Sequence, residues 1–383
     1  MPETAIPPPG FEVGPIRPPS EALSLLVRVT RNCPYNRCAF CPVYKGQKFS
    51  LRSVGEVKAD IDAMAALARR IEAAASARGG MDDELMRALV LAPGGGAAVQ
   101  VAEFLTAGGR TAFLQDANSL IMPVDELCEL LRHLRQAFPS LRRVSSYARS
   151  HTVRQRTVAE LERLREAGLS RVHIGLESGS DRVLELVSKG ATAARHVEAG
   201  LRVKEAGLHL CEYVMPGLGG KILSEEHALE TARVLRAIDP HFIRLRTVTI
   251  PAQSGLAELC AAGRFEPLGD IETVPELRLL LSGLEGVTSS VRSDHILNLL
   301  EEVSGKLPED LPRLLGVVDR FLGLAEGEQV LFMVGRRLGA LRRLEDLDDP
   351  ASRARAQTLL ERLRSRSPGS IDAAVREIMA RFV

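Results

Sequence analysis

The sequence predicts an α/β protein, a partial (β/α)6 barrel followed by a mostly helical C-terminal extension. Three observations predict this class. Six strand-like segments alternate with five helical segments between residues 23 and 250. Polar residues gather where these strands end, which is where parallel α/β folds place their chemistry. Beyond residue 250 the hydrophobic period turns mostly helical.

The alternation itself requires parallel strands joined by right-handed crossovers. An open doubly wound sheet and a barrel both satisfy it, and we predict the barrel. The expected strands are 23–30, 110–120, 142–150, 171–180, 209–220 and 241–250. The helical segments between them are 54–75, 123–138, 157–168, 180–207 (broken near residue 191) and 224–238.

We divide the chain into an N-terminal arm (1–22), a core barrel (23–250) and a C-terminal extension (251–383). The first twenty residues hold seven of the 21 prolines, so we expect an extended arm. The segment 81–109 lengthens the first crossover, and its triple glycine predicts a loop, with a strand at "RALVLA" as the alternative. In the extension we expect helices over 276–284, 295–303 and 309–324, and a charged pair after Asp348.

Composition limits the class of protein. The chain has 383 residues, 45% of them hydrophobic, and a formal net charge of +1, which gives no clear nucleic-acid footprint. No apolar run approaches the roughly 20 residues of a membrane span. The N-terminus lacks the pattern of a signal peptide, so we expect a cytoplasmic protein with no membrane partner.

The segment "RNCPYNRCAFCPVYKG" places Cys33, Cys38 and Cys41 within nine residues, directly after the first predicted strand. Thiolates select zinc or iron–sulfur clusters. A structural zinc site needs four protein ligands. No histidine precedes His133, and the other three cysteines lie far away in the sequence. A cubane cluster with three irons held by protein and one left open is the better fit, and Phe40 would lie beside the open iron.

This loop resembles that of the radical S-adenosylmethionine (radical SAM) superfamily, with the spacing Cys-x4-Cys-x2-Cys and an aromatic residue before the last cysteine. The resemblance extends through the six β-α units. It is nearest to the branch of the elongator catalytic subunit and oxygen-independent coproporphyrinogen oxidase. The commonest spacing has three residues between the first two cysteines, whereas this chain has four.

The resemblance implies a [4Fe–4S] cluster on Cys33, Cys38 and Cys41 and S-adenosylmethionine as the cofactor. Reductive cleavage of SAM would give a 5′-deoxyadenosyl radical that takes hydrogen from an unidentified substrate. It also implies an electron donor such as flavodoxin or ferredoxin. The alternatives are a porphyrin- or RNA-directed radical SAM activity, and a non-catalytic SAM- or heme-binding protein.

The resemblance also suggests which residues hold SAM. Asp116, with Asn118, stands where relatives carry an acid for the SAM amino group, although the family's glycine-rich motif is missing. The alternative is an Asx turn that caps the next helix. Glu177 and Ser178 stand where relatives contact the ribose, and the alternative is helix capping, for which Ser180 is equally suited. Lys189 stands where relatives pair with the SAM carboxylate; otherwise it is a solvated lysine.

Further polar positions follow the other strands. Arg149, next to Tyr147, carries a planar fork that suits a carboxylate of SAM or of substrate. "MPGLGG", with Met215 and Gly217, provides a backbone that can approach adenine closely, although an ordinary loop would look the same. Arg244 and Arg246 share one face of a strand, and if that face is inward they would suit an anionic substrate.

Asp294 and His295 are the candidate catalytic residues, since an acid, a histidine and Asn298 converge only here beyond residue 250. An imidazole passes protons near neutral pH, and a neighbouring carboxylate can raise its pKa. A helix would put Asp294 and Asn298 on one face. The alternative is that Ser293 or Asp294 caps this helix and leaves His295 exposed.

Overall fold

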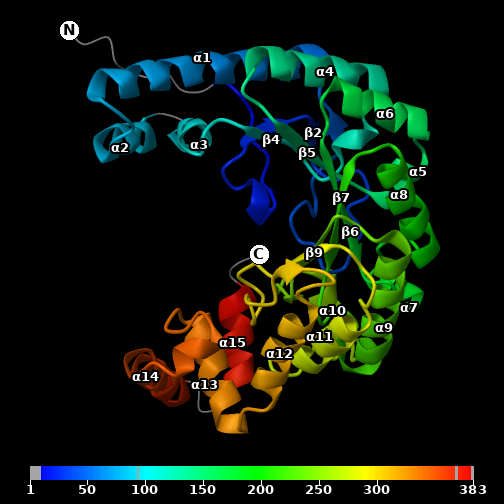
Figure 1. Cartoon of the computed structure of the whole chain (residues 1–383), viewed down its shortest axis with the longest axis vertical. Helices are drawn as coiled ribbons and strands as arrows, with labels where there is room; N and C mark the ends of the chain where they lie inside the picture. The colour runs from blue at the N-terminus through cyan, green and yellow to red at the C-terminus, as the bar shows by residue number, and fades with distance from the viewer. Residues whose placement is uncertain (1–9, 93–94, 367–369, 381–383) are drawn as a thin grey trace. The chain divides into compact units, whose positions relative to one another are not determined.

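The computed structural model describes residues 10–92, 95–366 and 370–380 (Figure 1). The chain forms two compact units, each built from separate stretches of sequence. The first comprises Met1–Pro34, Gly46–Ile174 and Arg202–His209. The second comprises Tyr35–Lys45, Gly175–Leu201 and Leu210–Val383. The division into arm, core and extension stays a prediction.

The main sheet is mostly parallel. Its strands follow the order β1 (Leu25–Arg28), β4 (Thr111–Gln115), β5 (Arg143–Ala148), β6 (Arg171–Glu177), β7 (His209–Val214), β8 (Phe242–Leu245), β9 (Ser290–Arg292) and β10 (Gly305–Lys306). The pairs β1–β4, β4–β5, β5–β6, β7–β8 and β8–β9 are parallel, and only β9–β10 is antiparallel. A separate antiparallel pair joins β2 (Thr30–Arg31) to β3 (Ser50–Leu51).

The predicted α/β class and all six predicted strands are confirmed, as β1, β4, β5, β6, β7 and β8. The short strands β9 and β10 were not predicted. Over the described residues the two ends of the sheet are not paired with each other, so the strands form a partial barrel.

In the first unit, helices follow the strands as the hydrophobic period predicts. They are α1 (Val54–Arg78), α2 (Asp83–Leu91), α3 (Gly95–Thr106), α4 (Val124–Ala137), α5 (Ser150–Arg154) and α6 (Val158–Ala167), with 3-10 turns at Pro19–Glu21 and Ser119–Ile121. α1, α4 and α6 lie side by side (Figure 1). Capping boxes begin α1 and α6, at Ser53 with Glu56 and at Thr157 with Glu160. Each such cap stabilises its helix by about 1 kcal/mol.

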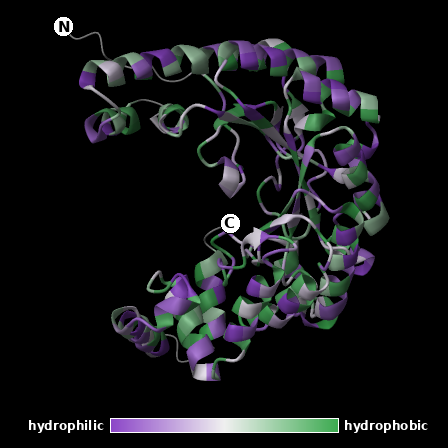
Figure 2. Ribbon diagram, in the orientation of Figure 1, coloured by the Kyte–Doolittle hydropathy of each residue, from purple (hydrophilic) through white to green (hydrophobic). Residues whose placement is uncertain are grey.

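The second unit is richer in helices. They are α7 (Asp181–Leu186), α9 (Gly220–Ile238), α10 (Gly255–Ala261), α11 (Thr273–Ser282), α12 (Leu311–Leu322), α13 (Glu326–Arg337), α14 (Pro350–Arg366) and α15 (Ile371–Met379), with a 3-10 turn at Leu344–Leu347. α8 (Ala193–Glu205) has residues in both units. The charged terminal pair is confirmed as α14 and α15, and α14 is hydrophilic along most of its length (Figure 2).

The prediction of a loop at the triple glycine is wrong for Gly95 and Gly96, which belong to α3, while Gly94 lies outside the described residues. The alternative strand at "RALVLA" is wrong as well, because Arg87–Leu91 lie in α2. α3 begins at Gly95, within the triple glycine. A Cβ at this position would lie 2.3 Å from the carbonyl oxygen of Val90. The glycine therefore permits a close approach between two helices rather than an open loop.

The predicted helix over 295–303 is also wrong, because this segment forms turns. Leu297, Leu299 and Leu300 are all buried, which a helix with one apolar stripe does not allow. The Arg337 guanidinium donates to the carbonyls of Ile296 and Leu297 at 2.8 and 2.9 Å. The Ser293 hydroxyl donates to the Leu300 carbonyl at 2.7 Å. Side chains therefore satisfy backbone groups that a helix would have paired.

The described part of the N-terminal arm is fixed to the first unit. The Glu12 carboxylate accepts from Arg28 at 2.6 Å and from Arg31 at 2.9 Å. The Gly14 N–H donates to the Gln115 side chain at 2.9 Å. A Cβ on Gly14 would lie 2.2 Å from Oδ1 of Asp116, so the arm passes directly over this buried carboxylate. Residues 10–18 form no helix or strand, Pro19–Glu21 form a 3-10 turn, and the arm covers the end of β4.

Arg28 holds this arrangement together because it also pairs with Asp116, at 2.7 Å. Asp116 has no exposed surface, so Arg28→Met would leave a buried carboxylate without its counter-ion. We expect a loss of about 3–5 kcal/mol in the free energy of unfolding, measured by urea denaturation. Arg78→Met, which breaks an exposed pair with Glu84, should cost under about 1 kcal/mol. Equal small losses for both variants would contradict this account of the arm.

Candidate functional site

The cysteine loop is anchored at its start within the first unit. Cys33 follows β2 and is half-buried. The preceding residue, Asn32, has a φ of 69°, a left-handed conformation that asparagine tolerates. Its backbone N–H donates to Oδ2 of Asp116 at 2.9 Å, and its side chain donates to the Lys48 carbonyl at 2.7 Å. Asp116 therefore orients the backbone directly before Cys33.

Cys38 and Cys41 lie in the second unit, and both are half-buried. The Cys41 N–H donates to the Cys38 carbonyl at 3.3 Å, which closes a turn around Ala39 and Phe40. Ala39 is buried, its N–H donates to the Val187 carbonyl at 2.8 Å, and its carbonyl accepts from Leu256 at 3.0 Å. This turn is therefore held by the core of the second unit, on which Phe40 also packs.

The donor set fits an iron–sulfur cluster in its chemistry. Three thiols stand on one loop within nine residues, and none is fully buried. Across the part of the chain that the structure describes, no three His, Cys, Asp or Glu side chains are gathered as a metal site. The fit therefore rests on the type and spacing of the ligands.

Glu177 and Lys189 form an ion pair at the end of β6. Nζ of Lys189 lies 2.8 Å from Oε1 of Glu177, and the side chains are only 13% and 12% exposed, respectively. Glu177 has a φ of 61°, so the chain turns sharply here. A Cβ on Gly175 would lie 2.0 Å from Oε1 of Glu177 and 2.9 Å from Nζ of Lys189. Gly175 therefore leaves the space that this pair occupies.

Two further groups surround this pair. Nζ of Lys189 lies 5.6 Å from the centre of the Phe40 ring, within range of a cation–π contact. Glu212, on β7, is fully buried, and neither carboxyl oxygen has a hydrogen-bond partner of good geometry among the described residues. Burial and then the Glu177 charge raise the pKa of Glu212 well above its usual range, opposed only in part by Lys189 and the Leu176 backbone. These surroundings therefore favour the neutral form of the Glu212 carboxyl group.

These groups fit a zwitterionic cofactor such as SAM. A lysine that faces a carboxylate can instead pair with the carboxylate of a ligand, and Glu177 can accept from hydroxyls or an ammonium group. Glu212 is an acid that the sequence analysis missed. Its position inside the apolar run of a buried strand was the available signal, since an unpaired acid is rarely placed there.

Ser178, Met215 and Gly217 lie around the same strand end. The Met215 N–H donates to the Glu177 carbonyl at 3.0 Å. The Ser178 hydroxyl lies 2.8 Å from Nδ1 of His227, so it does not cap a helix. Ser180 caps α7 instead, so the alternative of helix capping is correct for Ser180. Gly217 has a φ of 85°, which glycine adopts readily.

Asp116 and Asn118 lie in the first unit, and one carboxylate oxygen of Asp116 and the amide of Asn118 already have protein partners, whereas Oδ1 of Asp116 has no hydrogen-bond partner among the described residues. Oδ2 of Asp116 accepts from Arg28 and from the Asn32 N–H. Asn118 donates to Thr152 at 2.8 Å and accepts from the Arg149 N–H at 3.1 Å. Arg149 is the residue before α5, next to Tyr147, whose ring meets Phe113 edge-on at 5.0 Å. Roles of Asp116, Asn118 and Arg149 in SAM binding stay predictions.

Asp294 and His295 follow β9 in the second unit. The Asp294 carboxylate accepts from Arg244 at 2.5 Å, so the acid and the arginine predicted from different segments do meet. Burial lowers the pKa of His295 to about 4, and the Arg246 charge adds to this, with Asp294 only partly opposing it. The neighbouring acid Asp294 does raise this pKa, as expected, but burial and the Arg246 charge outweigh it. Asn298 instead binds backbone, accepting from the Thr247 N–H at 2.9 Å.

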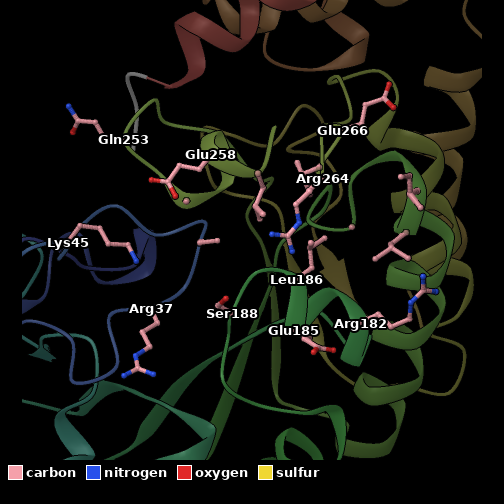
Figure 3. A pocket seen from close by; sticks show the side chains of 17 residues that line it. Arg37, Lys45, Arg182, Glu185, Leu186, Ser188, Gln253, Glu258, Arg264 and Glu266 are labelled. Atoms are coloured by element: carbon pink, nitrogen blue, oxygen red, sulfur yellow. The ribbon is translucent and has the colours of Figure 1, made fainter. Parts of the chain in front are cut away.

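A cavity of about 1000 Å³ opens beside the Cys38–Cys41 turn in the second unit (Figure 3). Arg37 and Lys45 reach it from the cysteine loop, Arg182 comes from α7, and Arg264 follows α10. Glu185, Glu258 and Glu266 add negative charge to its wall. Ala39 lines the cavity, whereas Glu177 and Lys189 do not. It therefore gives access to the turn at Ala39.

The comparisons with known proteins agree with this chemistry. Residues 97–233 match the family model described as the radical SAM superfamily. This segment of the chain is therefore similar to a radical SAM domain, in agreement with the resemblance of the cysteine loop. The match begins after residue 46, so the domain and the loop are independent observations. The search of curated proteins found no match.

Among solved structures, the chain is similar to the archaeal Elp3 of Methanocaldococcus infernus at 16% identity and a TM-score of 0.41, covering 51% of each chain. It is similar to HemN, the coproporphyrinogen III oxidase of Escherichia coli, at 16% identity and a TM-score of 0.43, and the match covers 69% of this chain and 52% of that one. It is similar to the methyltransferase TsrM of Kitasatospora setae at 15% identity and a TM-score of 0.44, and the match covers 90% of this chain and 61% of that one. The chain therefore spans between about half and two thirds of these proteins. No helix in the described part of the chain is long and apolar enough to span a membrane.

The shifted pKa of His295 predicts a pH dependence of stability. The folded protein keeps His295 neutral down to about pH 4, while the unfolded chain takes up this proton near pH 6.5. The unfolded state therefore binds more protons between these values, so stability present above pH 6.5 is lost as the pH falls towards 4. His295→Gln should remove this part of the slope in urea unfolding. An NMR titration of the His295 ring with a midpoint near 6.5 would contradict the assignment.

Proposed function

We propose that this protein holds a [4Fe–4S] cluster on Cys33, Cys38 and Cys41 and cleaves SAM reductively, so that hydrogen is taken from an unidentified substrate. The observation that carries this proposal is the three-cysteine loop with Phe40, found together with an independently matched radical SAM domain. The elongator and coproporphyrinogen oxidase branch, and a porphyrin or RNA substrate, remain alternatives within this proposal.

When bound, the cluster supplies an electron that breaks a carbon–sulfur bond of SAM and yields a 5′-deoxyadenosyl radical. The chain's own residues bind and orient the cofactor. Lys189 would release Glu177 in part and pair with the SAM carboxylate. Glu177 and Glu212 would then bind the amino or hydroxyl groups. Phe40 would cover the cofactor from the side of the cysteine turn and exclude water.

The backbone of Met215–Gly220 is the proposed wall against adenine, and Ser178 supports it through His227. Arg149, Asp116 and Asn118 are retained as weaker SAM candidates. For Asp116, the contacts favour a supporting role, since its partners are Arg28 and the backbone before Cys33. It would hold Cys33 in position rather than touch the cofactor.

A polar group of the substrate would bind at four side chains of the second unit, those of Arg244, Arg246, Asp294 and His295. The buried Nε atom of Arg246 has no hydrogen-bond partner among the described residues, so an anionic substrate group would complete its contacts. His295, neutral at pH 7, can accept a proton or a hydrogen bond but is not a reservoir of protons. Once a substrate is known, His295→Gln should lose its turnover while uncoupled SAM cleavage persists, and the loss of both would contradict this placement.

An electron donor such as flavodoxin or ferredoxin is part of the proposal. The cavity beside the Cys38–Cys41 turn, with Arg37 and Lys45, is the candidate contact surface. Charge reversal of Lys45 to glutamate should slow cleavage driven by flavodoxin and leave cleavage driven by dithionite unchanged. A flavodoxin-driven rate in the Lys45→Glu variant equal to that of the wild type would exclude this surface.

Anaerobic reconstitution should load about four irons per chain. Alanine in place of Cys33, Cys38 or Cys41 should remove most of the iron and sulfide, because each removes a ligand. The reconstituted protein with dithionite should convert SAM to 5′-deoxyadenosine and methionine, measured by chromatography. Alanine at Cys128, Cys211 or Cys260 is the matched control and should keep the cluster. Bound zinc without sulfide would refute the proposal, and SAM binding without 5′-deoxyadenosine would indicate a binding protein.

Lys189→Met should weaken SAM binding by about tenfold or more, because it removes a charged hydrogen bond to the cofactor. Glu177→Gln should weaken it as well, with iron content unchanged in both variants. Lys221→Met is the control, since Lys221 pairs with Glu266 and Glu272 on the surface of the same unit. The measurement is equilibrium SAM binding to the reconstituted protein. Unchanged affinity in Lys189→Met would place SAM elsewhere.

A further inference from the structure

A buried chain of hydrogen bonds runs behind the Glu177–Lys189 pair, in the second unit. The Ser178 hydroxyl lies 2.8 Å from Nδ1 of His227, and Nε2 of His227 lies 3.1 Å from the Met215 carbonyl. Glu276 accepts from the Gly217 N–H at 2.6 Å through one oxygen and from the Ser224 hydroxyl at 2.6 Å through the other. Ser178, His227 and Glu276 are at most 3% exposed.

The partners define which atoms donate. A carbonyl only accepts, so Nε2 of His227 carries the hydrogen that goes to Met215. Nδ1 then accepts from the Ser178 hydroxyl, whose oxygen in turn accepts from the Ser180 N–H at 3.1 Å. Oε1 of Glu276 lies 3.6 Å from Nε2, close enough for attraction but not for a good hydrogen bond. The ring is therefore held from both sides.

This chain reaches both elements that the proposed function assigns to SAM. Ser178 directly follows Glu177, and the Met215 N–H donates to the Glu177 carbonyl. Gly217 belongs to the proposed adenine wall, and Glu276 holds its N–H. The wall is also closely packed, because a Cβ on Gly219 would lie 2.6 Å from the Leu223 carbonyl oxygen. Its backbone thus depends on two side chains, one from α9 and one from α11.

We propose that His227 and Glu276 are positioning residues, which hold the Met215–Gly220 backbone against the Ser178 end of β6 and so set the geometry of SAM binding. This inference rests on the proposed function. Glu276 lies beyond the matched domain, which ends at residue 233. The C-terminal part of the chain therefore completes the cofactor site rather than forming a separate appendage.

A buried carboxylate and a buried imidazole are costly unless their polar atoms are satisfied. Here each side chain contacts one backbone group of the Met215–Gly220 segment and one serine hydroxyl. An apolar pair of similar size would support the fold as well. The polar pair differs in that it fixes the orientation of peptide groups, which apolar packing does not.

The test compares His227→Leu and Glu276→Gln with Asp270→Asn, which weakens the buried Arg337–Asp270 pair elsewhere in the same unit. Hydrogen exchange of the 215–220 backbone should become about tenfold faster in His227→Leu and Glu276→Gln, measured without cofactor. SAM affinity should fall about tenfold with iron content unchanged. Asp270→Asn should lower Tm and leave both of these readouts unchanged.

If His227→Leu does not fold, Ser178→Ala removes only the hydroxyl that contacts His227 and the Ser180 N–H, and it should show the same two effects at smaller size. His227→Gln, which keeps a donor and an acceptor, should recover part of the affinity. Faster exchange throughout the unit with unchanged SAM affinity would overturn the inference and assign the pair to stability. A wild type that binds no SAM would refute the proposed function, and unaltered 215–220 exchange in His227→Leu would refute the positioning role by itself.

Discussion

The Glu177–Lys189 ion pair is the interaction on which the second unit's site depends. The two charges are almost removed from water, and Gly175 leaves room for them only because it has no side chain. A second acid, Glu212, lies beside them, and burial and the Glu177 charge raise its pKa, which favours its neutral form. Such a pair gains little for stability by itself, since desolvation offsets much of its attraction. The arrangement suits a ligand with one positive and one negative group, because each group can take the place of one partner of the Glu177–Lys189 pair.

The same constraint, that a buried carboxylate needs partners, organises the surroundings of the cysteine loop. In the first unit one carboxylate oxygen of Asp116 accepts from Arg28 and from the backbone before Cys33, and the N-terminal arm covers this acid. In the second unit Glu276 is satisfied by Gly217 and Ser224. Each of these two buried acids therefore holds the backbone of a nearby segment. Asp116 binds the N–H of Asn32, directly before Cys33, and Glu276 binds the N–H of Gly217.

The sequence predicts helices and strands well where they are determined by the hydrophobic period of one short segment. The six strands follow from the hydrophobic period, and the resemblance singles out Glu177 and Lys189 as separate candidates. The ion pair between these two side chains was not predicted. Contacts between distant segments are not predictable in this way. His227 meets Ser178 across 49 residues, and Glu276 meets Gly217 across 59, with no motif at either helical position. The segment 295–303 has a helical period, yet Arg337 satisfies its carbonyls and it forms turns.

The most direct test of the central claim is the electron paramagnetic resonance spectrum of the reduced, reconstituted protein with and without SAM. An open iron that binds SAM predicts a [4Fe–4S]⁺ signal whose g-values shift when SAM is added, and which is lost in Cys38→Ala. Lys189→Met should need more SAM for the same shift. A reduced cluster whose signal is indifferent to saturating SAM, or a protein that assembles no cluster at all, would contradict the account.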